Sequence, residues 1–121
     1  MSIDLQAFAE DNFCYLTTTG RVSGRPHIVE IWFALHGATL YMLAGGRDRA
    51  DWVKNIQRHP DVQVRIHEHI FSGKGRIVQD LHEDTLARQI VLDKYASRYN
   101  DDLQSWSRTS LPIAVDLTLS T

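Results

Sequence analysis

Hydrophobic and polar residues alternate along several short stretches of the chain, as they do in strands that bury one face. These stretches are rich in aromatic and β-branched residues and stop at glycine or proline, which favours strands over helices. They cover residues 13–20, 27–36, 40–46 and 111–119, and residues 61–81 contain two further strands or one bent strand. The pattern predicts about six strands, most of them antiparallel.

Other segments have the periodicity of helices: residues 3–10, residues 47–59, residues 82–99 and a short piece around residues 101–107. In the second of them Trp52, Val53 and Ile56 share one stripe, Asp48 is the expected N-cap, and Pro60 requires the helix to end before it. Helices inserted among antiparallel strands are typical of an α+β fold whose sheet closes into a barrel.

Composition narrows the possible classes of protein. A chain of 121 residues is expected to form one domain, residues 1–121. The formal charge of −2 provides no general attraction to nucleic acid or to an anionic membrane, and no apolar run approaches the length that would insert into one. A single cysteine, Cys14, and an N-terminus with acids rather than basic residues fit a cytoplasmic protein.

Two turns contain the residues that suit an anion. In "GRVSGRPH" the glycines allow close backbone approach, Ser23 can donate a hydrogen bond, and Arg21 and Arg25 flank the turn beside His27. In "GGRDRADW" two glycines precede a helix N-terminus, with Arg47 and Arg49 nearby. Each turn alone is most simply a solvated surface turn, but two of them in one hairpin region favour a phosphate pocket.

These motifs carry a resemblance to a known family. "LTTTGRVSGRPHIVEIWF" followed by "GGRDRADWVKNIQRHPDVQV" resembles the deazaflavin (coenzyme F-420)-dependent nitroreductase family, part of the split β-barrel group that includes pyridoxamine phosphate oxidase-like flavoproteins. The most specific match runs from Trp52 to Val64, and "SRTSLPIAVDL" is similar to the family's closing strand. Tyr95, Tyr99 and Trp106 lie where that group often has aromatic residues.

The resemblance implies a split β-barrel oxidoreductase that transfers a hydride from a reduced deazaflavin to a quinone, a nitro compound or an activated alkene. Coenzyme F-420 is the first choice of cofactor and FMN the alternative. A homodimer is also expected. The residues implied to bind the cofactor are Arg21, Ser23, Gly24, Arg25, His27, Ile31, Trp32, Phe33, Leu43, Ala44, Gly45, Gly46, Arg47, Arg49, Trp52 and Asn55.

The chain departs from the family pattern at the first turn. Val22 replaces the usual lysine, His27 occupies the position of the usual arginine, and Glu30-Ile31 replaces a Pro-Leu pair. Because basic residues at these positions help to hold the cofactor phosphate in the family, their loss keeps a second function in play. That alternative is a non-catalytic protein that binds or carries a flavin, a haem or a related tetrapyrrole on the same barrel.

No catalytic residue can be assigned from the sequence, which contains no recognisable base or nucleophile. Tyr95, Tyr99 or solvent could supply a proton to the product. Trp32, Phe33 and Trp52 are expected to form apolar walls of the site, although packing alone would also explain them. His67 and His69 of "HEH" would share a strand face, but neither cysteine nor acid completes a metal site, so none is predicted.

Overall fold

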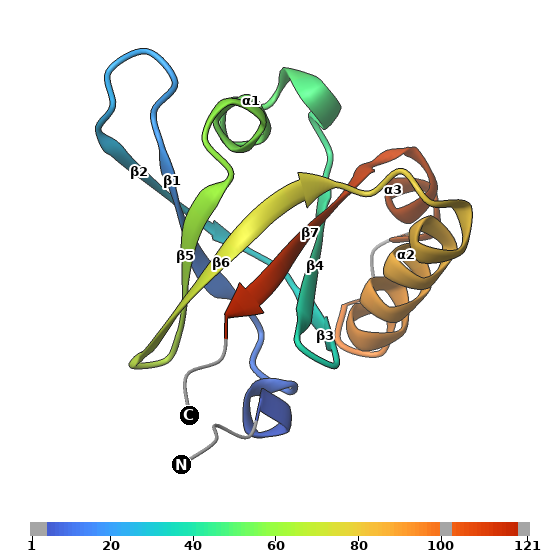
Figure 1. Ribbon diagram of the computed structural model, residues 1–121. Helices are drawn as coiled ribbons and strands as arrows, with labels where there is room; N and C mark the ends of the chain where they lie inside the picture. The colour runs from blue at the N-terminus through green and yellow to red at the C-terminus, as the bar shows by residue number, and fades with distance from the viewer. Residues whose placement is uncertain (1–4, 100–102, 119–121) are drawn as a thin grey trace.

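The structure is a computed structural model that describes residues 5–99 and 103–118. Seven antiparallel strands form one sheet in the order β2-β1-β5-β6-β7-β4-β3 (Figure 1). The strands are β1 (Cys14–Thr19), β2 (Pro26–Ile31), β3 (Ala34–His36), β4 (Thr39–Ala44), β5 (Asp61–Ile66), β6 (His69–Ile77) and β7 (Leu111–Thr118). The predicted α+β split barrel is confirmed, with seven strands rather than about six.

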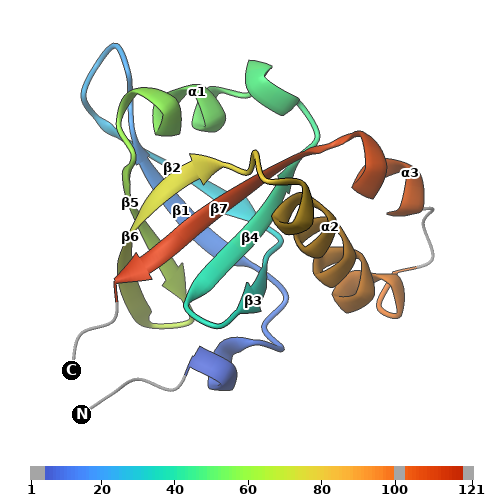
Figure 2. The ribbon, with the colours of Figure 1, turned by 45° about the vertical axis from the view of Figure 1, so that its right-hand side comes forward.

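The sheet curls into a half-barrel whose interior is filled by apolar side chains (Figure 2). Alternation along β1 places Cys14, Leu16 and Thr18 inside, and Met42 and Val115 face them from the other half of the sheet. The two edge strands, β2 and β3, follow one another in the chain. The barrel is therefore split between them.

The extra strand arises because the predicted strand over residues 27–36 is interrupted. Trp32 and Phe33 lie outside both β2 and β3. Phe33 is fully buried in the barrel core, whereas Trp32 packs in a second apolar cluster on the outer side of the sheet. The Phe33 N–H donates to the Tyr95 hydroxyl at 3.0 Å, and its carbonyl accepts from the Lys94 amine at 2.8 Å. A helix distant in sequence thus satisfies the backbone at the interruption.

A helix closes one end of the barrel. The 3-10 helix η2 (Arg47–Arg49) leads into α1 (Asp51–Arg58), whose Val53 and Ile56 are buried against the core. The helix ends before Pro60 as predicted, but the expected N-cap was wrong: Asp48 lies within η2, and Ala50 precedes α1 without a side-chain cap. The chain makes an extra short turn before α1, so the helix starts later than the pattern indicated.

The first of two further helices covers the outer side of β3, β4 and β7, and the second packs against the first. They are α2 (Leu81–Ala96), which Asp80 caps by accepting from the Glu83 N–H at 2.9 Å, and α3 (Leu103–Thr109). Both correspond to predicted helices, and residues 101 and 102 of the second prediction lie outside the described residues. At the end of the barrel opposite α1, the 3-10 helix η1 (Leu5–Phe8) buries Leu5 and Phe8; residues 3 and 4 of that predicted helix lie outside the described residues.

The outer face of β1, β2 and β5 carries none of the described helices (Figures 1 and 2). Within residues 5–99 and 103–118, no helix is long and apolar enough to cross a membrane.

Candidate functional site

The turn between β1 and β2 is closed by its own backbone. The Gly20 N–H donates to the Arg25 carbonyl at 2.8 Å, and the Gly24 N–H donates to the Gly20 carbonyl at 2.9 Å. Gly24 has a φ of +72°, a conformation that glycine adopts without strain. The Ser23 Oγ accepts from the Arg25 N–H at 3.1 Å, which leaves its hydroxyl proton available to a further acceptor.

Asn55 on α1 attaches this turn to the rest of the barrel. Its Oδ1 accepts from the Arg21 N–H at 3.1 Å and from the Arg21 guanidinium at 3.0 Å, while its Nδ2 donates to the Thr18 hydroxyl at 3.1 Å. Asn55 is only 2% exposed. Because a buried amide needs partners, the turn, β1 and α1 are fixed relative to one another.

A pocket of about 320 Å³ lies between the turn and α1. A Cβ on Gly20 would lie 2.7 Å from both His27 Nε2 and Ser23 Oγ, so these two side chains come together over the glycine. The guanidinium of Arg21 joins them, and a second of its nitrogens donates to Asp51 Oδ1 at 3.1 Å. The pocket is lined by Gly20, Arg21, Val22, Ser23, His27, Asp51 and Asn55.

The split between the edge strands leaves backbone without a strand partner. β3 pairs with β4 only from Thr39 to Tyr41, so Met42–Ala44 pairs with β7 on one side and with no described strand on the other. β2 likewise pairs with β1 along one side, and no described strand pairs with its other side. Two strand edges with free hydrogen-bonding groups therefore border the split.

Aromatic side chains gather beside the end of β4. Trp32 stacks on Tyr95, with ring centroids 4.3 Å apart and planes 6° apart, and its centroid lies 4.7 Å from that of Tyr99. Trp106 of α3 meets Trp32 edge-on at 5.6 Å. A Cβ on Gly45 would lie 3.6 Å from Trp106 Nε1, so the glycine loop runs directly past this ring. We call Trp32, Tyr95, Tyr99 and Trp106 the aromatic cluster.

Buried hydroxyl and amine groups near the cluster have structural partners. The Tyr95 hydroxyl lies 2.7 Å from the Asn12 carbonyl and 3.1 Å from the Phe33 carbonyl, and burial raises its pKa well above the usual value. Burial, with a smaller contribution from Arg98, lowers the pKa of Lys94 to about 8. Tyr99, by contrast, is 38% exposed.

The structure brings some of the predicted residues together and separates others. Arg21, Ser23, His27 and Asn55 line one pocket, and Gly24 and Arg25 belong to the same turn. The residues that border the split are Ile31, Trp32, Leu43, Ala44, Gly45 and Gly46.

The remaining predicted residues point elsewhere. Arg47 donates to the Thr109 carbonyl, Arg49 is exposed, and Trp52 packs against the barrel core. The ring of Phe33 lies inside that core rather than in the wall of a pocket.

Three residues that line the pocket between the turn and α1 were not among the predicted cofactor-binding residues: Gly20, Val22 and Asp51. Asp51 was visible as an acid at the start of a helix, but its approach to Arg21 depends on how the turn docks.

The "HEH" segment does not place its histidines on one strand face. His67 and Glu68 form the turn between β5 and β6, with His67 at a φ of 54°, and His69 begins β6. His67 pairs with Asp11 at 3.1 Å, whereas His69 lies against the Phe8 ring at 5.0 Å. Among the described residues, no three His, Cys, Asp or Glu side chains are placed to hold a metal ion.

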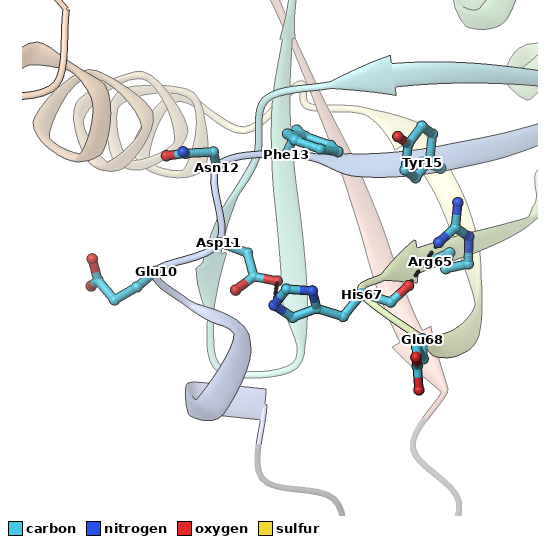
Figure 3. Close-up of a pocket in the computed structure, with 8 residues that line it drawn as sticks. All are labelled: Glu10, Asp11, Asn12, Phe13, Tyr15, Arg65, His67 and Glu68. Atoms are coloured by element: carbon cyan, nitrogen blue, oxygen red, sulfur yellow. Dashed lines mark hydrogen bonds and ion pairs between the residues drawn. The ribbon is translucent and has the colours of Figure 1, made fainter.

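A pocket of about 610 Å³, larger than the one beside α1, lies at the opposite barrel end, next to this turn (Figure 3). Arg65 lies over the Tyr15 ring, 4.4 Å from its centroid, and donates to the His67 carbonyl at 2.8 Å. This pocket is lined by residues that were not predicted to bind the cofactor: Glu10, Asp11, Asn12, Phe13, Tyr15, Arg65, His67 and Glu68.

Solved structures share this fold at low sequence identity. One, described as an F420-H2 dependent reductase (FDR-A), is 17% identical with a TM-score of 0.69, covering 86% of this chain and 93% of its own. Another, the heme storage protein HutZ from Vibrio cholerae, is 16% identical with a TM-score of 0.70, covering 97% and 91%. A third, described as a domain-swapped dimer, is 18% identical with a TM-score of 0.70, covering 86% and 79%.

A family model provides the more specific comparison. The model for F420H(2)-dependent quinone reductase matches residues 5–118, nearly the whole chain. The match confirms the resemblance found in the turn and helix motifs. The chain therefore belongs to the F420H(2)-dependent quinone reductase family, and it is an oxidoreductase whose cofactor is coenzyme F-420.

Proposed function

We propose that the protein transfers a hydride from reduced coenzyme F-420 to a quinone or a similar electrophile, such as a nitro compound or an activated alkene. The observation that carries the proposal is the pocket at the β1–β2 turn, where Arg21, Ser23 and His27 converge over Gly20 beside the open split. The family match supports the choice of a quinone as acceptor.

The pocket suits the phosphate of the coenzyme. Arg21 supplies guanidinium N–H groups, Ser23 a hydroxyl and His27 an imidazole, and all three are donors that phosphate oxygens accept. Asn55 holds Arg21 through two hydrogen bonds, so the guanidinium is oriented before any ligand binds. Arg25 is exposed in the same turn and adds positive charge nearby.

The split suits the planar ring system. The free backbone edge at Met42–Ala44 offers hydrogen-bonding groups, and Trp32 and Trp106 offer apolar surface next to Gly45. Aromatic side chains around a ring exclude water, which strengthens the electrostatic interactions that orient it.

The coenzyme supplies the hydride, and the protein supplies binding and orientation. Tyr95 is a poor source of the proton that the reduced acceptor needs, because its hydroxyl is buried and bonded to backbone. Tyr99 lies in the same aromatic cluster and is partly exposed, so we assign proton delivery to Tyr99 or to water.

The test changes Arg21 and Arg25 together to alanine and follows coenzyme F-420 binding by fluorescence titration. We expect the dissociation constant to rise about 100-fold, since the variant removes the charge-assisted contact of Arg21, worth roughly 1.5–3 kcal/mol, and the nearby positive charge of Arg25. Arg65→Ala, an exposed arginine at the opposite barrel end, is the matched control and should bind normally. Unchanged affinity in the double variant would place the phosphate elsewhere.

A non-catalytic role in carrying a flavin, a haem or a related tetrapyrrole is the weaker alternative. The similarity to HutZ is at the level of the fold. Mixing the purified protein with reduced coenzyme F-420 and a soluble quinone separates the two functions. Consumption of the reduced coenzyme supports the reductase, whereas tight haem binding without consumption supports the alternative.

We further propose that the protein forms a homodimer through the uncovered face of β1 and β2. Ile28 is 66% exposed on that face, at the edge strand of the sheet, and a protein of this fold is described as a domain-swapped dimer. Ile28→Glu should convert dimers to monomers in sedimentation experiments. Leu81→Glu, which alters an even more exposed residue on α2, should leave the assembly unchanged. A wild-type monomer would exclude this interface.

A further inference from the structure

The phosphate pocket proposed above contains an acid that opposes its function. Of the described residues lining it, Arg21 and Asp51 carry charges at neutral pH when His27 is counted as neutral. The two charges form an ion pair of 3.1 Å and cancel. A pocket built only to attract phosphate would not need a carboxylate, so Asp51 calls for a different explanation.

An incoming anion can replace the Asp51 carboxylate as the partner of Arg21. The Asp51 side chain is 85% exposed and that of Arg21 is 32% exposed, and pairs as exposed as this contribute only about 0–1 kcal/mol. Asn55 holds Arg21 from the buried side with two separate hydrogen bonds. Arg21 therefore keeps its position whether its outer nitrogen contacts Asp51 or an incoming anion.

The two candidate cofactors differ in the charge that they bring to this pocket. The phosphate of coenzyme F-420 is a diester and carries one negative charge. The phosphate of FMN is a monoester with a second pKa of about 6, so it carries nearly two at neutral pH. A carboxylate next to the site repels the second anion more than the first.

We propose that Asp51 is a specificity-determining residue, which makes the pocket select the singly charged phosphodiester of coenzyme F-420 over the doubly charged phosphomonoester of FMN. The inference rests on the proposed position of the phosphate. Val22 stands where the family usually has a lysine, so this position adds no positive charge that could offset Asp51. Because Asp51 offsets the one fixed cation, Arg21, the pocket has no surplus positive charge to balance a second negative charge on the ligand.

The test compares dissociation constants for coenzyme F-420, FMN and riboflavin, which lacks a phosphate, in the wild type and in Asp51→Asn. Removing the carboxylate should raise FMN affinity about tenfold and coenzyme F-420 affinity about threefold. Riboflavin affinity should not change. Asp51→Ser, measured in the same way, shows whether the effect follows the lost charge rather than the new amide.

Asp61→Asn is the matched control. Asp61 is an exposed carboxylate paired with Lys74 at 2.5 Å, and it lines a different pocket on the outer face. Its removal changes the net charge of the protein by the same amount. We expect it to leave the ratio of FMN to coenzyme F-420 affinity as it is in the wild type.

The outcomes separate this inference from the proposed function. If Arg21→Ala with Arg25→Ala weakens coenzyme binding while Asp51→Asn leaves the affinity ratio unchanged, the pocket binds phosphate but Asp51 does not select it. If Asp51→Asn weakens both cofactors equally, Asp51 only positions Arg21, and the inference is overturned. If none of these variants alters binding, the phosphate site and this inference both fail.

Discussion

Asn55 links three parts of the molecule through one side chain. Its amide contacts Arg21 in the turn and Thr18 in β1, and it projects from α1. The sequence motif identified Asn55 as a family position, but the motif does not say that the residue holds an arginine. That arrangement depends on the docking of α1 over the turn, which no local pattern encodes.

Asn55→Ala should lower the free energy of unfolding by about 1–3 kcal/mol, because it leaves the buried Thr18 hydroxyl and the Arg21 N–H without their partner. It should also weaken coenzyme binding. Urea denaturation and fluorescence titration measure the two effects. Gln57→Ala, an exposed position on the same helix, should be nearly neutral, and a similar loss there would contradict the argument.

Glu83 is a second residue whose charge matters, here for stability. Arg76 donates to both of its carboxylate oxygens at 2.7 Å, and these hydrogen bonds lower the pKa of Glu83 to about 2. A carboxyl group whose pKa is lower in the folded protein than in the unfolded chain stabilises the folded state at pH values above the unfolded pKa, here 4.5. That stabilisation is lost as the pH falls from about 4.5 to about 2.

We therefore expect Glu83→Gln to lower stability at pH 7 by about 2 kcal/mol and to reduce the loss between pH 4.5 and pH 2. Denaturant midpoints measured across this range test both statements. Glu68→Gln changes an exposed carboxyl at the opposite barrel end and should reproduce the wild-type profile. If Glu83→Gln lost as much stability between pH 4.5 and pH 2 as the wild type does, the Glu83 carboxylate would not be the source of that loss.

At the scale of elements, the position of α1 depends on a strand glycine. A Cβ on Gly75 of β6 would lie 2.8 Å from Ile56 Cγ2, and the Gly75 N–H donates to the Pro60 carbonyl at 2.8 Å. Ile56 is buried and branched, so it has little room to move. The helix can lie this close to the sheet only because β6 has no side chain at that point.

Gly75→Ala should destabilise the fold by about 1–3 kcal/mol through overpacking against Ile56. Gly46→Ala is a suitable comparison, since its Cβ would meet Ala50 at an ordinary 3.4 Å and its φ of −77° is open to any residue. Thermal unfolding midpoints of the two variants show whether the added methyl group at position 75 destabilises the fold more than the one at position 46. Equal unfolding midpoints would mean that α1 moves away from β6 without loss of stability, and would contradict the prediction.

Local pattern predicted most elements but not their interruptions. Alternation marked the strands, and Pro60 marked the end of α1. The same alternation continues through "IVEIWFAL", where the structure breaks the strand at Trp32 and Phe33. The cause of the break lies about 60 residues away, where Lys94 and Tyr95 bind the Phe33 backbone. A sequence window cannot contain such a contact, and the same reason hid the pairing of Asp51 with Arg21.

At the scale of the whole molecule, the proposed cofactor site joins segments that are far apart in the chain. The turn after β1, the end of β4 and helix α3 all border it. A ligand that binds this arrangement and not the unfolded chain stabilises all of it together. Cofactor binding and global stability are therefore linked.

Coenzyme F-420 at 100 times its dissociation constant should raise the free energy of unfolding by about 2.7 kcal/mol. Denaturation with and without the coenzyme measures this increment. At the same coenzyme concentration the Arg21→Ala, Arg25→Ala double variant should gain well under half as much. An identical gain in both proteins would argue against the pocket at the β1–β2 turn.

The strand order also has a consequence for synthesis. β7 comes last in the chain among the described strands, yet it lies between β6 and β4 and pairs with both. While a ribosome is still extending the chain, the hairpin of β3 and β4 has no partner strand, so one border of the split cannot yet be in place. Nascent chains that stall before Leu111 should not retain the coenzyme. Coenzyme capture would then distinguish chains that contain β7 from chains that stop before it.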